Sequence, residues 1–215
     1  MYWMRRSRAR SERGAVAVEA ALVTPLLLIL VFGIIEMSLL MRDVMATSSA
    51  VRVGARMAST AAGAGPGTCK AGDTTCTPQK APRVAQVAAD AIQRAGSAMP
   101  KDSIDWILVY RANTSGYPLP DSNKSLTTCS TDCVKYVWDK DLDKFRYLSG
   151  QWDSRSINAC VNDASLMAVG VAMRSHHDWI TGFFGNGVDL EERTVMQFEP
   201  LDNNSCKPGT LTPHP

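Results

Sequence analysis

A carboxylate lies alone just inside a long apolar stretch near the N-terminus, and its surroundings could support proteolytic processing. The chain carries no charge between Glu19 and Glu36, and Gly14 lies five residues before Glu19. An unpaired carboxylate at membrane depth costs about 2.5 kcal/mol or more, so it usually has a partner or a function. Cleavage after Gly14 would supply a partner, because the new α-amine of Ala15 can pair with Glu19 of a neighbouring subunit. Glycine suits such a cut, since it has no side chain to obstruct a peptidase.

Two adjacent histidines and an aspartate form a cluster that could bind a metal or exchange protons. They are His176, His177 and Asp178, and the third histidine, His214, lies near the C-terminus. Adjacent residues at the end of a strand point to opposite faces, so the two imidazoles cannot share one ion without distortion. We therefore expect a surface turn at these residues rather than a metal site.

Three alternating aspartates, Asp139, Asp141 and Asp143, resemble the start of a calcium-binding loop. Such a loop needs a glycine at its sixth position and a glutamate at its twelfth, and neither is present. The sequence also lacks the short motifs of serine hydrolases, zinc metalloproteases and P-loop enzymes. We predict no catalytic residue, no metal and no cofactor, and thus a protein that is not an enzyme.

All six cysteines follow the apolar stretch, at Cys69, Cys76, Cys129, Cys133, Cys160 and Cys206. An even number confined to this part of the chain favours disulfides in an oxidising compartment. Zinc sites use closer, repeated pairs than the spacings found here. Six cysteines allow about 15 pairings, and the sequence alone does not choose among them. Short loops favour Cys69 with Cys76 and Cys129 with Cys133, which leaves Cys160 for Cys206.

The element that must position Glu19 is a long helix behind a basic leader. Residues 1–14 contain five arginines, at Arg5, Arg6, Arg8, Arg10 and Arg13. Arginines beside an apolar segment remain in the cytoplasm, and the net charge of +2 is too small to indicate nucleic-acid binding. Residues 20–41 are long enough to cross about 30 Å of hydrocarbon, if Glu36 lies near the outer headgroups or against a partner. Pro25 is tolerated there with a local kink.

The apolar pattern continues beyond the length that a membrane requires. An apolar stripe recurs at helical spacing on one face, through Leu40, Val44, Val51, Ala55, Ala58 and Ala62. Arg42, Arg52 and Arg56 fall on the opposite face. We therefore predict one helix over residues 15–60 whose outer half packs under a globular domain. An anchor followed by an unrelated surface helix is the alternative.

The remaining residues, 61–215, fit one modest domain of the α+β class with disulfides and an antiparallel sheet. A Gly-, Pro- and Thr-rich loop is followed by a second helix after Pro82, with Gly96 and Pro100 as stop signals. Five segments rich in β-branched and aromatic residues predict strands at 104–110, 134–138, 144–148, 165–175 and 192–199.

The basic leader, Gly14, and Glu19 as the fifth residue after it resemble class III prepilin signals. The following VEAALVTPLLLILVFGIIE resembles the start of TadE-like (TadE/TadG family) pilus assembly proteins of the tight-adherence system. The C-terminal run from Met167 to Leu201 is also similar to that family. It consists of a predicted strand, an aromatic turn and a last strand that closes with Glu199-Pro200. The resemblance implies cleavage between Gly14 and Ala15 by a prepilin peptidase.

The expected function is that of a minor pilin or pseudopilin for a type IVc tight-adherence pilus. Its expected partners are the prepilin peptidase, other TadE/TadF-like pilins, the major pilin and membrane lipid, with no nucleic acid. The expected location is the cytoplasmic (inner) membrane, in a single pass with the N-terminus inside and the C-terminal domain outside, or an extracellular pilus after assembly. The alternative is a secreted or anchored binding module or enzyme with an ordinary signal sequence, cut near Ala46 to Ala50.

Overall fold

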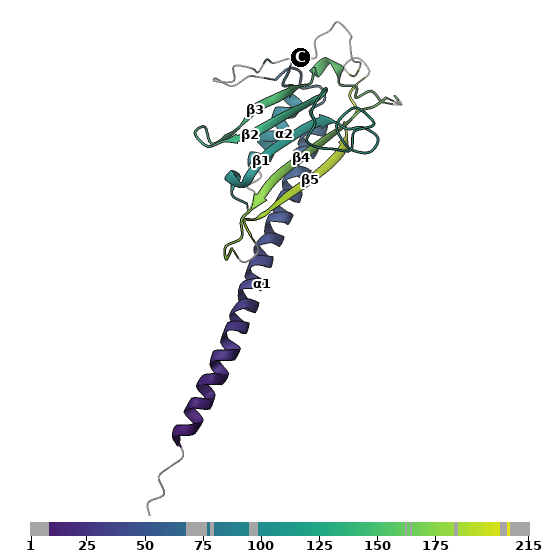
Figure 1. The fold of residues 1–215 in the computed structure, drawn as a ribbon. Helices are drawn as coiled ribbons and strands as arrows, with labels where there is room; N and C mark the ends of the chain where they lie inside the picture. Colours follow the sequence, from purple (N-terminus) through teal and green to yellow (C-terminus); the bar gives the residue numbers. More distant parts are fainter. Residues whose placement is uncertain are drawn as a thin grey trace, which may run out of the picture.

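The protein consists of one long helix and a small α+β domain that surrounds its outer end (Figure 1), which confirms the predicted fold class. The computed structural model describes residues 9–67, 77, 80–94, 99–161, 163, 165–182, 185–202 and 206. His214, Cys69 and Cys76 lie outside the described residues.

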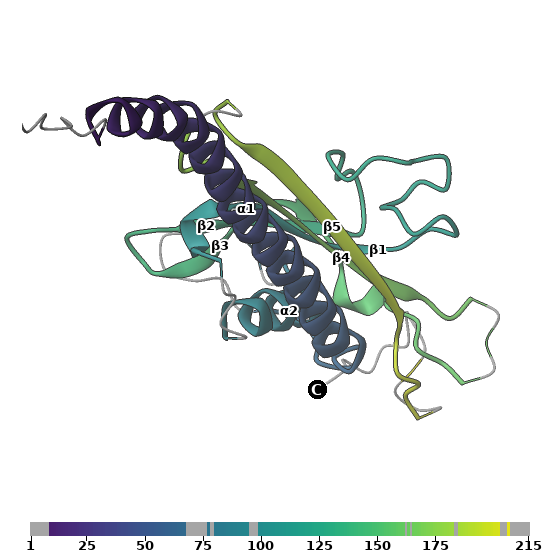
Figure 2. The same ribbon diagram turned by 90° about the horizontal axis from the view of Figure 1, so that it is seen from below.

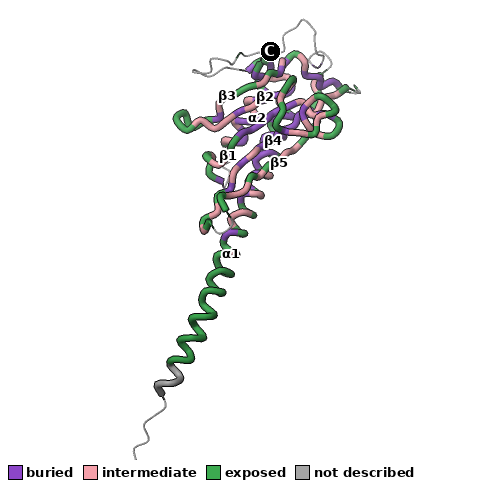
Figure 3. The backbone as a smooth tube through the Cα atoms, viewed as in Figure 1, coloured by how far each residue is buried: buried purple, intermediate pink, exposed green. Residues whose placement is uncertain are grey.

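Helix α1 (Ala9–Ser59) is continuous across Pro25 and begins before the predicted start at residue 15. Its residues from 14 to 32 are all exposed, whereas buried positions recur from Glu36 to the end of the helix. Figure 3 shows this change along the helix, from a fully exposed part to a part enclosed by the domain. Four members of the predicted stripe, from Val51 to Ala62, are buried, and the three arginines expected opposite it are exposed. The predicted amphipathic extension is therefore confirmed.

The sheet is antiparallel and has the strand order β3-β2-β1-β4-β5. Its strands are β1 (Ile104–Arg111), β2 (Cys133–Asp139), β3 (Lys144–Gln151), β4 (Ala168–His177) and β5 (Val188–Gln197). All five were predicted, although β5 begins earlier than expected and β4 later. Short 3-10 turns at Lys101–Ser103 (η1) and Ser154–Ser156 (η2) precede β1 and follow β3. The loop that joins β4 and β5 is the part of the domain nearest to the exposed part of α1 (Figure 1).

Helices α1 and α2 (Arg83–Arg94) cover the same face of the sheet (Figure 2). Small residues let them approach closely: a Cβ added at Gly54 of α1 would lie 2.9 Å from Ile92 Cδ1 of α2 and 3.3 Å from Val171 Cγ1 of β4. Helix α2 buries one face of mostly small apolar residues, Val84, Ala85, Ala88, Ala89, Ala91 and Ile92. The main core therefore lies between the two helices and the sheet.

A second, smaller cluster covers the opposite face, where Trp106, Leu108 and Tyr110 of β1 pack with Leu126 of the β1–β2 connection. Asn113 organises that connection: its amide nitrogen donates to the carbonyl oxygens of Pro118, Pro120 and Asn123, and its Oδ1 accepts from the Ser115 and Tyr117 amides. Asn123 adds further hydrogen bonds to Pro118 and Ser125, so two asparagine side chains hold this connection.

The C-terminal segment closes the domain against the end of α1. The Glu199 amide donates to the Ser59 carbonyl oxygen, and Phe198 is 1% exposed. The structure contains the disulfides Cys129–Cys133, which its short loop favoured, and Cys160–Cys206, which was the remaining pair. The helix, the sheet and the last described residues thus form one packed unit.

Candidate functional site

The predicted processing residues lie on the bare part of α1. Gly14, Ala15 and Glu19 are exposed, and a Cβ added at Gly14 would meet no atom within 4 Å. Glu19 makes no hydrogen bond or ion pair with any residue in the described part of the chain. The glutamate is therefore available to a partner outside the chain, whereas the Gly14–Ala15 bond lies in helical backbone that a peptidase would have to unwind.

The surface around Glu19 is apolar on every side. Exposed side chains include Val16, Val18, Leu22, Leu26, Ile29, Leu30 and Ile34. By length and composition the helix from Gly14 to Ser59 could cross a membrane, with a mean hydropathy of 2.5 in its most apolar window. None of that window is buried by the rest of the described chain. Such a surface is compatible with a membrane anchor or with packing against other apolar helices.

Glu36, the next charge along the helix, is only 1% exposed. Its carboxylate accepts hydrogen bonds from the Ile180 amide at 3.2 Å, the Thr181 amide at 2.6 Å and Thr181 Oγ1 at 2.8 Å. The donors belong to the loop between β4 and β5. The sequence had left open whether Glu36 meets headgroups or a partner, and the structure provides this loop as a partner.

Two turns further along, Asp43 makes the second polar contact between α1 and the end of β4. Asp43 Oδ2 lies 2.6 Å from His177 Nδ1, and both side chains are buried, at 7% and 4% exposure. Thr47 continues the row, since its Oγ1 lies 3.2 Å from Ser175 Oγ. His177 Nε2 is buried and has no hydrogen-bond partner in the described part of the structure. The expectation of a surface turn is thus wrong for His177, because its strand ends against the helix rather than in solvent.

His176 points to the other side, as strand geometry requires. Its Nδ1 lies 2.7 Å from Asp189 Oδ1 on β5, and its Nε2 lies 3.4 Å from Asp178 Oδ1. The hydrogen bond to Asp189 raises the pKa of His176, with smaller contributions from the Asn186 carbonyl and the charge of Asp178. The same bond, together with Arg174, lowers the pKa of Asp189. The two imidazoles are therefore engaged separately, on opposite faces of the sheet.

The remaining candidates are far from this junction. Asp139, at the start of the β2–β3 turn, accepts from the Asp141 and Leu142 amides and pairs with Arg146 at 3.0 Å.

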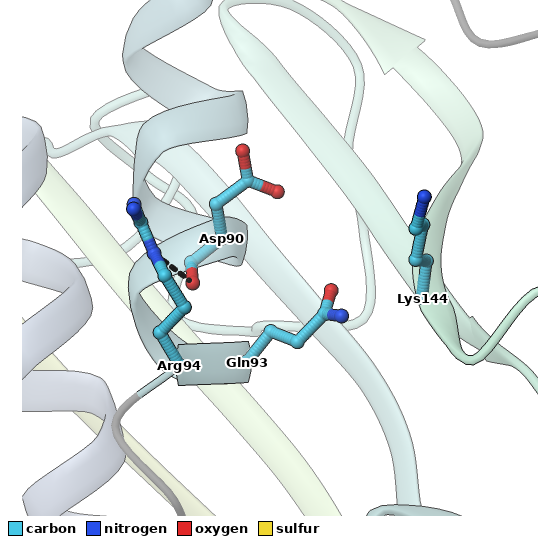
Figure 4. A pocket seen from close by; sticks show the side chains of 4 residues that line it. All are labelled: Asp90, Gln93, Arg94 and Lys144. Atoms are coloured by element: carbon cyan, nitrogen blue, oxygen red, sulfur yellow. Dashed lines mark hydrogen bonds between the residues drawn. The ribbon is translucent and has the colours of Figure 1, made fainter.

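An open pocket of about 320 Å³ lies between the end of α2 and the start of β3 (Figure 4). It is lined by four polar residues, Asp90, Gln93, Arg94 and Lys144. No group of three potential metal ligands occurs in the described residues.

The structure thus defines a class: a protein that presents a bare apolar helix and holds a small disulfide-bonded α+β domain on the outer half of that helix. Residues 14–56 match the family model described as TadE-like protein, which confirms the resemblance for this part of the chain and indicates a protein related to tight-adherence pili. This family is associated with pili rather than with catalysis. No curated protein and no solved structure matches the chain.

The family match covers α1 from the proposed cleavage point to the part enclosed by the domain. The polar row of Glu36, Asp43 and Thr47 was missed by sequence reasoning. Spacing offered a signal, since these residues are seven and four positions apart and therefore lie on one helical face. Their partners lie near the other end of the chain, so the spacing predicts the polar face of the helix but not the residues that it contacts.

Proposed function

We propose that this protein is a non-enzymatic, pilin-like component of a type IVc tight-adherence pilus. In this role a prepilin peptidase removes residues 1–14 at the cytoplasmic face of the inner membrane. The mature α1 then joins other pilin-like helices, while residues 61–215 remain outside. The observation that carries the proposal is Glu19, an unpaired and exposed carboxylate on an otherwise apolar helix surface.

The cost of that carboxylate supports an assembly role. A lone charge at membrane depth is costly, and pairing with a cation relieves part of the cost. Cleavage after Gly14 would generate an α-amine on Ala15 at the same end of the helix. The amine of one subunit and Glu19 of the next can then form the pair that no described residue of the single chain provides.

Processing is tested by mass spectrometry of the mature N-terminus. The wild-type protein is expected to begin at Ala15. Gly14→Leu should block cleavage, because the added side chain obstructs the approach of a peptidase to the backbone. Gly33→Leu is a matched control, since Gly33 is a helical glycine of α1 with no atom within 4 Å of an added Cβ. A wild-type protein that retains its leader in assembled material would contradict the proposal.

Assembly is tested with Glu19→Gln, which keeps the shape of the side chain and removes its charge. We expect normal membrane insertion and cleavage, but reduced recovery of the protein with other pilus subunits and fewer pili. Glu12→Gln is the matched control, because Glu12 leaves with the leader and should have no effect on assembly. Equal pilus formation by both variants would argue against a pairing role for Glu19.

The alternative, an ordinary signal sequence cut near residues 46–50, finds less support. Ala46 and Ala50 are 8% and 3% exposed within the packed part of α1. A cut there would separate Glu36 and Asp43 from the domain that they contact. A mature protein that starts beyond Met45 would nevertheless favour this alternative.

A further inference from the structure

We propose that the loop between β4 and β5 enters the outer leaflet of the membrane, where Trp179 and Ile180 contact phospholipid and Glu36 holds the loop against α1. This inference rests on the membrane-spanning role proposed for α1 and adds a second element that contacts lipid. It concerns the described part of the loop, residues 178–182 and 185–187.

The exposed charges of α1 set the depth. Because Glu36 is buried by the loop, the first exposed charge after Glu19 is Arg42, whose side chain is 47% exposed. The uncharged surface between them covers residues 20–41, about 22 residues or roughly 33 Å of helix. That length matches a hydrocarbon core of about 30 Å. Arg42 therefore marks the level of the outer headgroups.

Glu36 lies below that level. It precedes Arg42 by six residues, which corresponds to about 9 Å along the helix. The lipid-facing side chains around it remain apolar, since Ile35, Met37 and Met41 are 46%, 55% and 52% exposed. The loop atoms bonded to Glu36 must lie at the same depth. Ile180 and Thr181 are thereby placed beneath the headgroups.

The contact satisfies both sides at this depth. A carboxylate in a membrane requires donors, and backbone amides in a membrane require acceptors. The Glu36 carboxylate accepts hydrogen bonds from the Ile180 and Thr181 amides and from the Thr181 hydroxyl. The carboxylate thus gains donors and the two amides gain an acceptor. A loop that stayed in water would not need a buried carboxylate as its acceptor.

The side chains of the β4–β5 loop become less polar with increasing depth in the membrane. His177 contacts Asp43, the neighbour of Arg42, so the polar residues His176 and Asp178 lie at headgroup level. Beyond them the polarity falls: Trp179 packs edge-on against His177 with ring centroids 5.0 Å apart, and Ile180 is 73% exposed. Tryptophan favours the boundary between headgroups and hydrocarbon, and an exposed isoleucine favours the layer beneath. Figure 1 shows this loop as the part of the domain nearest to the bare helix.

Site-specific photocrosslinking in the full-length protein tests the proposal. Benzoylphenylalanine is introduced at Ile180, Leu28 or Leu142, and the protein is reconstituted in vesicles of phosphatidylethanolamine and phosphatidylglycerol. Leu28 of α1 and Leu142 of the β2–β3 turn are matched controls, since both are exposed, at 47% and 48%. We expect lipid adducts at Ile180 in a yield similar to Leu28 and at least about five-fold above Leu142, because only the first two reach hydrocarbon depth.

The outcomes separate the two proposals. Lipid adducts at Leu28 with only the Leu142 background at Ile180 would overturn the loop inference and leave a spanning helix intact. No lipid adduct at Leu28 would overturn the membrane role itself and the loop inference with it. Adducts of Ile180 with a second protein copy but not with lipid would also overturn the loop inference.

A second measurement avoids any disturbance by the label. Bromine on the acyl chains of the same lipids quenches nearby tryptophan, and the fluorescence difference between wild type and Trp179→Phe isolates Trp179. We expect this difference signal to be quenched by acyl-brominated lipid. An unquenched Trp179 in vesicles where Leu28 crosslinks to lipid would count against insertion of the loop.

Discussion

The hydrogen bond between Asp43 and His177 connects residues 134 positions apart and fixes the end of β4 on α1. Both side chains are buried, so the loss of either leaves the other without its partner inside the protein. Asp43 also pairs with Arg42, but that guanidinium is half-exposed and contributes less. Substitution of Arg42 removes only the ion pair of Asp43, whereas substitution of Asp43 removes the contact with His177 as well.

We expect Asp43→Ala to reduce the free energy of unfolding of the full-length protein in detergent by about 2 to 4 kcal/mol, because it leaves a buried imidazole donor unsatisfied. Chemical denaturation followed by circular dichroism measures the change. Arg42→Ala should cost less than about 1 kcal/mol. If the two variants were equally destabilised, the exposed ion pair rather than the His177 contact would hold the junction.

The pair His176–Asp189 should make stability depend on pH. The pKa of His176 is raised above 6.5, so its contribution is complete below 6.5 and is lost as the pH rises through the folded-state pKa. The pKa of Asp189 is lowered below 3.8, so its contribution is present above 3.8 and is lost as the pH falls through the folded-state pKa. The pair therefore stabilises the fold most between these limits.

We expect the difference in melting temperature between wild type and His176→Gln to be larger at pH 5.5 than at pH 8.5. Three further groups surround this pair. Asp178 lies 3.4 Å from His176, and Arg174 pairs with Asp189 and lies 3.4 Å from Asp105. The variant retains these neighbours, so the comparison with wild type isolates the loss of the His176 imidazole. A difference that grows toward high pH would contradict the assigned partner.

At the scale of elements, the packing of α1 against α2 depends on Gly54. An added Cβ already meets the end of the Ile92 side chain, which can move, but a larger group also meets Val171. Gly54→Leu should therefore cost about 1 to 3 kcal/mol of unfolding free energy, despite the better helix propensity of leucine. Ser49→Leu, at an exposed position of α1, should change stability by less than about 0.5 kcal/mol. Similar stability of the two variants would show that the helices can separate without cost.

Helices and strands could be predicted because their signals are local. The apolar stripe of α1 and the β-branched runs are periodic over a few residues, and the structure has them at nearly the same positions. The polar junction depends instead on residues 134 and 145 positions apart, as in Asp43 with His177 and Glu36 with Thr181. No periodicity connects such residues. The prediction of a surface turn at His177 was wrong for this reason, because the distant helix α1 packs on this residue and buries it.

At the scale of the whole molecule, the last described part of the chain is tied back to the segment between η2 and β4. Cys206 is bonded to Cys160, and the Leu201 amide donates to the Ala159 carbonyl oxygen. The Glu199 amide reaches the end of α1. These contacts join the helix, the sheet and the C-terminal segment, so the orientation of the domain follows that of the helix.

The two described disulfides should differ in their contribution to this closure. A disulfide stabilises mainly by restricting the unfolded chain, and the restriction grows with the length of the closed loop. Cys160–Cys206 spans a separation of 46 residues and Cys129–Cys133 a separation of 4. On this basis the double substitution Cys160→Ala/Cys206→Ala should cost about 4 kcal/mol and Cys129→Ala/Cys133→Ala about 2 kcal/mol. Denaturation of both variants at equal pH and detergent concentration measures the difference. Equal losses would mean that native contacts near each bridge, rather than loop entropy, determine how the domain is held closed around the outer half of α1.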